Sequence, residues 1–86
     1  MKNNRTDFAE TASEIDLRGL RCPMPVLRTQ KYLKTLRAGD RLAVLADDPL
    51  AAIDIANLCR EEGHLLIESR SRGEETGFLI EVGKDS

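Results

Sequence analysis

The 86-residue sequence contains no tryptophan, one tyrosine and two phenylalanines. Its hydrophobic core must therefore be mainly aliphatic, and nucleic-acid bases would find few aromatic side chains to stack on. No apolar run approaches the roughly 20 residues that a membrane-spanning helix needs. Positive charge is not in excess, since the net charge is −2, which argues against a protein that coats nucleic acid. We expect no membrane and no direct nucleic-acid partner.

Cysteine is also scarce, because Cys22 and Cys59 are the only two. The first residues lack the apolar segment and the cleavage site of a secretory signal peptide. We therefore expect a cytoplasmic protein, in which thiols stay reduced, and two free cysteines are favoured over a disulfide. Two cysteines and His64 do not supply the four closely paired ligands of a structural zinc site, so no metal is expected.

The hydrophobic pattern predicts a single domain, residues 14–86, behind a polar stretch, residues 1–13, that we interpret as a flexible leader. Period-2 alternation indicates strands and period-3.6 spacing indicates helices. The predicted elements follow the order β-α-β-α-β-β, with strands at 14–18, 41–46, 64–70 and 77–82 and helices at 23–37 and about 49–62.

Both predicted helices have start and stop signals. Pro23 takes the first helical position, where its missing N–H has no helical partner to lose, and Gly39 suits a left-handed end. The segment 47–49, Asp-Asp-Pro, is a helix-start signal in which the carboxylates are interpreted as caps, and Gly63 ends the second helix. The inward faces are expected to hold Val26, Leu27, Leu33 and Leu36 in the first helix and Ala52, Ile53, Ala56 and Cys59 in the second.

These elements predict an α/β (α+β) fold. The first β-α-β unit should make its two strands parallel through a crossover, and the last two strands should form a hairpin. Two helices then have one sheet face to cover. The result is a two-layer sandwich in which two helices cover one face of a mixed four-stranded sheet.

Cys22 opens a Cys-Pro-Met-Pro segment at the predicted cap position of the first helix. Pro23 and Pro25 fix two backbone angles and remove two N–H donors, which leaves the amides of Met24 and Val26 as expected donors toward the sulfur. A helix N-terminus favours a thiolate because its N–H groups are unpaired and partly positive. A rigid, exposed and reactive thiol is the functional interpretation, and a buried inert cysteine is the alternative.

Cationic residues are expected to tune this thiol. Arg21 is adjacent in sequence, Arg18 and Arg28 are expected nearby, and each would lower the pKa of Cys22. Arg18, Arg28 and Lys31 are also candidates for docking an acidic partner, although a basic helix face is often only a solvated surface.

Other polar residues admit alternatives. Cys59 lies at helical spacing on an apolar stripe and is interpreted as a core residue rather than as a resolving cysteine. A dithiol redox site would place a cysteine at position 25, where proline stands. Asp47 and Asp48 are interpreted as helix caps rather than as a metal or acid/base pair, and His64 as a surface residue rather than as a proton donor.

From Asp16 to Val82, the sequence resembles the TusA/SirA-like sulfur-carrier family. The stretch that carries the resemblance is 17–25, Leu-Arg-Gly-Leu-Arg-Cys-Pro-Met-Pro. Supporting matches are Gly39-Asp40, Asp47-Asp48-Pro49, Asp54-Ile55, Cys59 and Gly63-His64. The resemblance implies the two-layer β-α-β-α-β-β fold.

The resemblance also implies that Cys22 accepts a persulfide sulfur from a cysteine desulfurase and relays it to an acceptor protein. In the best-known members the relay feeds tRNA 2-thiouridine synthesis, and in relatives it feeds sulfur oxidation or other sulfur routes. Family members often have Glu between the two prolines, where this sequence has Met24, and this departure leaves the pathway open.

The sequence thus predicts a sulfurtransferase-type carrier rather than a stand-alone turnover enzyme. Cys22 is the expected catalytic residue, and Arg21, Pro23, Met24 and Pro25 are expected to tune and position it. No cofactor is expected, because the pyridoxal chemistry belongs to the donor. The chain alone is expected to be a monomer. The alternative is a non-catalytic regulatory or protein-binding module.

Overall fold

The computed structural model describes residues 13–83. Its elements are β1 (Ser13–Asp16), α1 (Met24–Leu33), β2 (Arg41–Ala46), α2 (Ala51–Glu62), β3 (Leu65–Arg72) and β4 (Glu75–Glu81). This is the predicted order. The predicted leader lies outside the described residues except for its last residue, Ser13, which begins β1.

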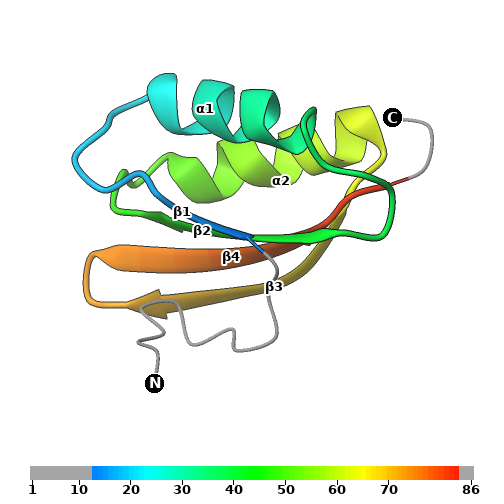
Figure 1. The fold of residues 1–86 in the computed structure, drawn as a ribbon. Coiled ribbons are helices and arrows are strands. Elements are labelled where there is room, and N and C mark those ends of the chain that lie inside the picture. The colour runs from blue at the N-terminus through cyan, green and yellow to red at the C-terminus, as the bar shows by residue number, and fades with distance from the viewer. Residues whose placement is uncertain (1–12, 84–86) are drawn as a thin grey trace.

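The four strands form one mixed sheet in the order β1-β2-β4-β3. Strands β1 and β2 are parallel, as the crossover through α1 predicts, and the β2–β4 and β3–β4 pairs are antiparallel. Both helices lie on the same face of the sheet (Figure 1). The predicted two-layer sandwich is therefore confirmed.

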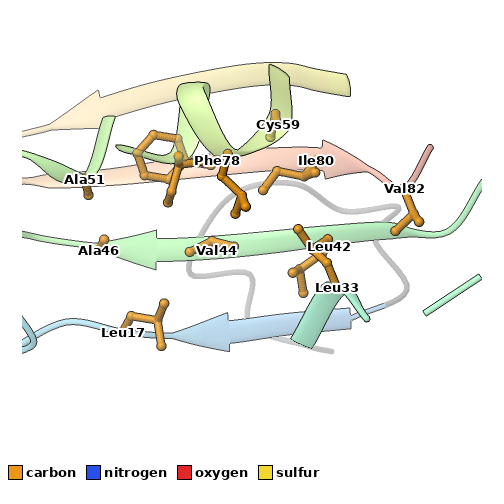
Figure 2. Close-up of a cluster of buried hydrophobic side chains, with 12 residues drawn as sticks. Leu17, Leu33, Leu42, Val44, Ala46, Ala51, Cys59, Phe78, Ile80 and Val82 are labelled. Carbon is orange, nitrogen blue, oxygen red and sulfur yellow. The ribbon is translucent and has the colours of Figure 1, made fainter. Parts of the chain in front are cut away.

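The core lies between the helices and the sheet (Figure 2). Leu42 and Val44 of the central strand β2 and Phe78 and Ile80 of β4 are fully buried there. Complete burial of an aliphatic or Phe side chain contributes about 1.5–3 kcal/mol. The other face of β2 is covered too, with Ala43 buried beside Leu79, which explains why β2 is apolar at nearly every position.

The inward face of α2 differs from the prediction. Its buried residues are Ala51, Ile55, Leu58 and Cys59, whereas Ile53 is 60% exposed and Ala52 is also exposed. Apolar residues stand on both sides of this helix, so spacing alone does not decide which side faces the sheet.

The inward face of α1 was also only partly predicted. Leu33 is buried as expected, but Leu27 is 48% exposed, and the buried set is completed by Pro25 and Thr29. The hydroxyl of Thr29 donates to the carbonyl oxygen of Pro25 over 2.8 Å, which satisfies a polar group inside the core. A polar residue that the hydrophobic pattern does not mark can therefore belong to the buried face of α1.

The ends of the two helices agree only in part with the sequence prediction. Helix α1 stops at Leu33 rather than at residue 37, and Gly39, with φ +94°, serves the turn before β2 instead of capping the helix. Gly63 caps α2 in the left-handed conformation, as predicted. No helix within residues 13–83 is long and apolar enough to cross a membrane.

Candidate functional site

The Cys22 loop, residues 17–23, leads from the end of β1 to the start of α1 (Figure 1). Leu17 is buried and still pairs with the sheet, donating its N–H to the carbonyl oxygen of Leu45 over 2.7 Å. A turn follows in which Gly19 has φ +89°, a conformation that side chains disfavour. The chain thereby turns from the sheet toward the helix layer.

Asp47 and Asp48, which directly follow β2, hold this loop in place. The carboxylate of Asp47 accepts hydrogen bonds from the N–H of Gly19 and from Arg21 Nη1, both at 2.9 Å. The carboxylate of Asp48 accepts the N–H of Cys22 at 3.1 Å. These contacts lower the pKa of Asp47, mainly through the Gly19 N–H and then through Arg21.

The interpretation of these aspartates as helix caps is wrong. Helix α2 begins later, at Ala51, with Leu50 at the cap position and no side-chain cap bond. Asp48 contributes its backbone carbonyl to that turn, accepting the N–H of Ala51 at 3.0 Å. Both carboxylates point to the Cys22 loop instead, because the parallel β1–β2 pairing brings the two strand ends together.

Cys22 stands one residue farther from the helix than predicted. Helix α1 starts at Met24 with Pro23 at the cap, and the Cys22–Pro23 peptide bond is cis. The N–H of Met24 donates to the carbonyl oxygen of Arg21 at 2.8 Å, so it is not a donor to the sulfur as expected. Met24 is exposed, and Pro25, the second residue of α1, is buried.

The thiol of Cys22 meets a carboxylate rather than cations. Its Sγ donates a hydrogen bond to Oδ2 of Asp54, on α2, over 3.4 Å. This bond is the main cause that raises the pKa of Cys22, and partial burial and the charges of Asp54 and Asp48 act in the same direction. The prediction of a lowered pKa is therefore wrong.

The arginines expected to activate Cys22 are engaged elsewhere. Arg21 forms an ion pair with Asp47 at 2.9 Å. Arg18 pairs with Asp16 at 2.8 Å and with Glu75, at the start of β4, at 3.0 Å. Carboxylates of the chain itself thus form ion pairs with both arginines. Neither arginine then lowers the pKa of the thiol, and nearby carboxylates raise it.

Arg28 and Lys31 lie on another side of α1. They border a hollow of about 500 Å³ together with Ile15 and Leu17, between α1 and the β1 edge of the sheet. Cys22 does not line this hollow. Arg28 is not among the groups that shift the pKa of Cys22, so the expectation that it lowers this pKa is wrong, while its role in docking stays a prediction.

Cys22 lies in a groove of about 340 Å³ between α1 and α2. We call it the thiol groove. Its apolar lining includes Val26, Leu27 and Leu58, and its polar lining includes three carboxylates but no lysine, arginine or histidine. The full lining is Cys22, Pro23, Val26, Leu27, Gln30, Asp54, Asn57, Leu58, Glu61 and Glu62.

Exposed apolar side chains occur in the first turns of both helices. Met24 is 36% exposed and Leu27 is 48% exposed on α1, while Leu50 and Ile53 at the start of α2 are 50% and 60% exposed. Asp54, which follows Ile53, binds the Cys22 thiol. Leu27 also lines the thiol groove, so an exposed apolar side chain that a partner protein can cover lies close to the thiol.

Cys59 and His64 occupy interior positions. Cys59 is free and 3% exposed, as predicted, and burial raises its pKa to about 11. The side chain of His64 is also 3% exposed, and its Nδ1 accepts the N–H of Gly83 at 3.0 Å, so its interpretation as a surface residue is wrong. Within residues 13–83 no group of three acidic, cysteine or histidine side chains is placed to hold a metal.

The family model described as Sulfurtransferase TusA matches residues 13–82. The chain belongs to the TusA family. It is 37% identical over 73 residues to the Sulfur carrier protein TusA of Allochromatium vinosum, covering 85% of this chain and 96% of that protein. It is also similar to the crystal structure of a SirA-like protein from Desulfitobacterium hafniense, with a TM-score of 0.73 and 27% identity over 84% of this chain and 99% of the other.

Sequence reasoning missed the contact between Asp54 and Cys22. Asp54 was noticed only as part of the family resemblance, and no role followed from it. No pattern signal pointed to it, because an acidic residue in the first turn of a helix is already favoured by the helix dipole. The contact itself depends on how α1 and α2 pack.

Proposed function

We propose that this TusA-family protein carries a sulfane sulfur as a persulfide on Cys22. The proposed donor is a cysteine desulfurase, and the proposed recipient is an acceptor protein. The main support is that Cys22 is the exposed one of the two free cysteines, both of which lie within the described residues. Its loop is held to the sheet by hydrogen bonds, so the thiol has a defined position.

Each transfer conserves atoms and electron pairs. In loading, Sγ of Cys22 attacks the outer sulfur of the donor persulfide, the donor S–S bond breaks, and the donor thiolate takes up the proton that Sγ gives up. The products are Cys22–S–SH and a donor thiol. In unloading, an acceptor thiolate attacks the outer sulfur and Cys22 leaves as a thiolate, as in thiol–disulfide exchange.

The proposed roles of the neighbouring residues follow from their positions. Arg21 anchors the loop through Asp47, Pro23 caps α1, and Pro25 is buried in the first turn of α1. Met24, exposed beside the thiol, is proposed to touch the partner. The chain itself supplies no cofactor chemistry in this proposal.

The basic side of α1 is proposed as a second docking surface. Arg28 and Lys31 border the hollow against β1, away from the thiol groove. Arg18, proposed before as a docking residue, is already paired with two carboxylates, so we assign the role to Arg28 and Lys31. An acidic segment of one partner would suit this surface.

We place the relay in the cytoplasm, where Cys22 would stay reduced, and propose tRNA 2-thiouridine synthesis as its destination. A strain lacking the gene should lose 2-thiouridine from its tRNA, and a plasmid copy should restore it unless Cys22 is replaced. An unchanged 2-thiouridine content would redirect the proposal to sulfur oxidation or another sulfur route.

The carrier function is tested by mass spectrometry. The protein is incubated with a pyridoxal-containing cysteine desulfurase and cysteine, and a mass gain of one sulfur atom is expected in the wild type and in Cys59→Ala. Cys22→Ser should show none. If Cys22→Ser gains the same mass, or if the wild type gains none with any desulfurase tested while Cys22→Ser still binds its partners, a non-catalytic binding module is the better description.

A further inference from the structure

Two carboxylates face Cys22 from different directions. Asp54, on α2, accepts a hydrogen bond from Sγ of Cys22 over 3.4 Å, and Asp48, before α2, accepts one from the backbone N–H over 3.1 Å. Within residues 13–83 neither carboxylate forms an ion pair. Arg21, the nearest cation in sequence, is paired with Asp47 instead. The charges that raise the pKa of the Cys22 thiol are those of Asp54 and Asp48, so the sulfur lies in a negative environment.

The thiol groove extends this negative environment. Besides Asp54 it contains Glu61 and Glu62 from α2, and α1 contributes the neutral Gln30, which donates to Glu62 over 2.6 Å. The cations of α1 that border a hollow, Arg28 and Lys31, face the other side of that helix. The charged side chains that line this groove are all carboxylates, beside apolar walls and the neutral amides of Gln30 and Asn57. Arg60, which is not part of the lining, donates to Asn57 Oδ1 at 2.7 Å. The lining is therefore complementary to an apolar segment with a positive charge.

We propose that Asp54 holds the Cys22 thiol in its neutral form at rest and admits sulfur partners that present a cationic group next to their own reactive sulfur. The proposal rests on the function proposed above and specifies the chemistry of the partner. An arginine or lysine of the partner pairs with Asp54, and the carboxylate then no longer retains the thiol proton.

The transfer step stays balanced under this proposal. As Sγ bonds to the outer sulfur of the donor persulfide, its proton passes to the departing donor thiolate, and the partner cation offsets the charge of Asp54. The resting protein thus slows the reaction of Cys22 with small electrophiles, and pairing of the partner cation with Asp54 makes the thiolate available for transfer.

Two small reagents of opposite charge test the proposal without any partner. Methanethiosulfonates with a trimethylammonium or a sulfonate tail transfer similar groups to a thiol, and the sulfinate leaves in both cases. The rate with each is measured on the native Cys59→Ala protein, in which Cys22 is the only thiol, and is divided by the rate on a one-cysteine peptide.

We expect the normalised rate with the cationic reagent to exceed that with the anionic reagent roughly tenfold, because two carboxylates lie near the sulfur. Asp54→Asn should remove most of this preference and should shift the alkylation profile to lower pH. Asp54→Glu, which keeps the charge, should restore part of the preference. A preference for the anionic reagent, or one unchanged in Asp54→Asn, would overturn the proposal.

Glu81→Gln is the matched control, since it also removes one negative charge. Glu81 pairs with Arg41 at the start of β2, whereas Asp47 and Asp48, which hold the Cys22 loop, follow the end of that strand. This variant should keep the full preference. If Asp54→Asn does not fold, the salt dependence of the unaltered site replaces it: raising salt toward 1 M, where screening acts within about 3 Å, should abolish the preference, and a salt-independent preference would contradict it.

The charge-preference experiment and the persulfide-loading experiment can fail independently of each other. Persulfide loading on Cys22 without charge preference would refute the role of Asp54 and leave the carrier function intact. Charge preference that depends on Asp54, in a protein that no desulfurase loads, would refute the carrier function and leave the electrostatic selection in place.

Discussion

Cys22 and Cys59 are the same residue in two settings, and both have a raised pKa. For Cys59 the cause is burial in the core. For Cys22 the first cause is a hydrogen bond to one carboxylate, Asp54. Only the pKa shift of Cys22 is reversible in the folded state. A partner can neutralise the carboxylate of Asp54, but it cannot expose Cys59 without unfolding the core.

The surroundings of the two residues reinforce this contrast. Cys59 packs on the inner side of α2 with Ile55, between helix and sheet (Figure 2). Cys22 lies on a loop whose fixed points are polar: a glycine turn and two aspartates. The core site is held by apolar contacts that exclude water, and the loop site by hydrogen bonds that leave the sulfur accessible.

The largest expected difference between the two cysteines is in chemical labelling. Native protein treated with iodoacetamide at pH 8 should be modified at Cys22 at least about a thousandfold faster than at Cys59, because Cys59 reacts only through unfolded molecules, which are rare. Peptide mapping by mass spectrometry measures both rates. Comparable rates in native protein would mean that Cys59 is reached through local opening of α2.

A smaller difference is expected in stability. Cys59→Ser buries a hydroxyl in the apolar core and should cost about 1–3 kcal/mol in the free energy of unfolding. Cys22→Ser should leave the urea midpoint unchanged within error, because that side chain is exposed. Urea titrations followed by circular dichroism measure both variants. An equal loss of stability would show that the Cys22 loop is part of the cooperative core.

The smallest expected effect is a loss in the free energy of unfolding at alkaline pH. A thiol with a higher pKa in the folded than in the unfolded state keeps more protons when folded, so stability falls as pH rises between the two values. For Cys59 this window runs from about 9 to about 11. At pH 10 the loss should be about 1 kcal/mol relative to pH 7.

Cys59→Ala provides the control for this pH effect. In that variant the part of the alkaline loss that comes from Cys59 should disappear, while urea titrations at pH 7 report the separate cost of removing the sulfur. Identical alkaline slopes in the wild type and in Cys59→Ala would show that other groups, Cys22 among them, account for the pH dependence.

Much of the fold was predictable because its signals are local. Alternation indicated several of the strands, and the structure shows the nearly continuous apolar run of residues 41–46 as the buried strand β2. Gly63 ended α2 where the pattern placed it. The helix faces were less predictable, because Ile53 and Ile55 lie on nearly opposite sides of α2 and both are apolar.

The sequence by itself determined the element order, the parallel first pair of strands, the core position of Cys59 and the placing of Cys22 between a strand and a helix. These depend on periodicity, turn residues and chain connectivity over short distances. Only the tertiary structure decided which charges meet the thiol. Asp48 and Asp54 reach Cys22 because β1 pairs with β2 and α1 packs beside α2, and electrostatic contacts between residues distant in sequence follow from that packing alone.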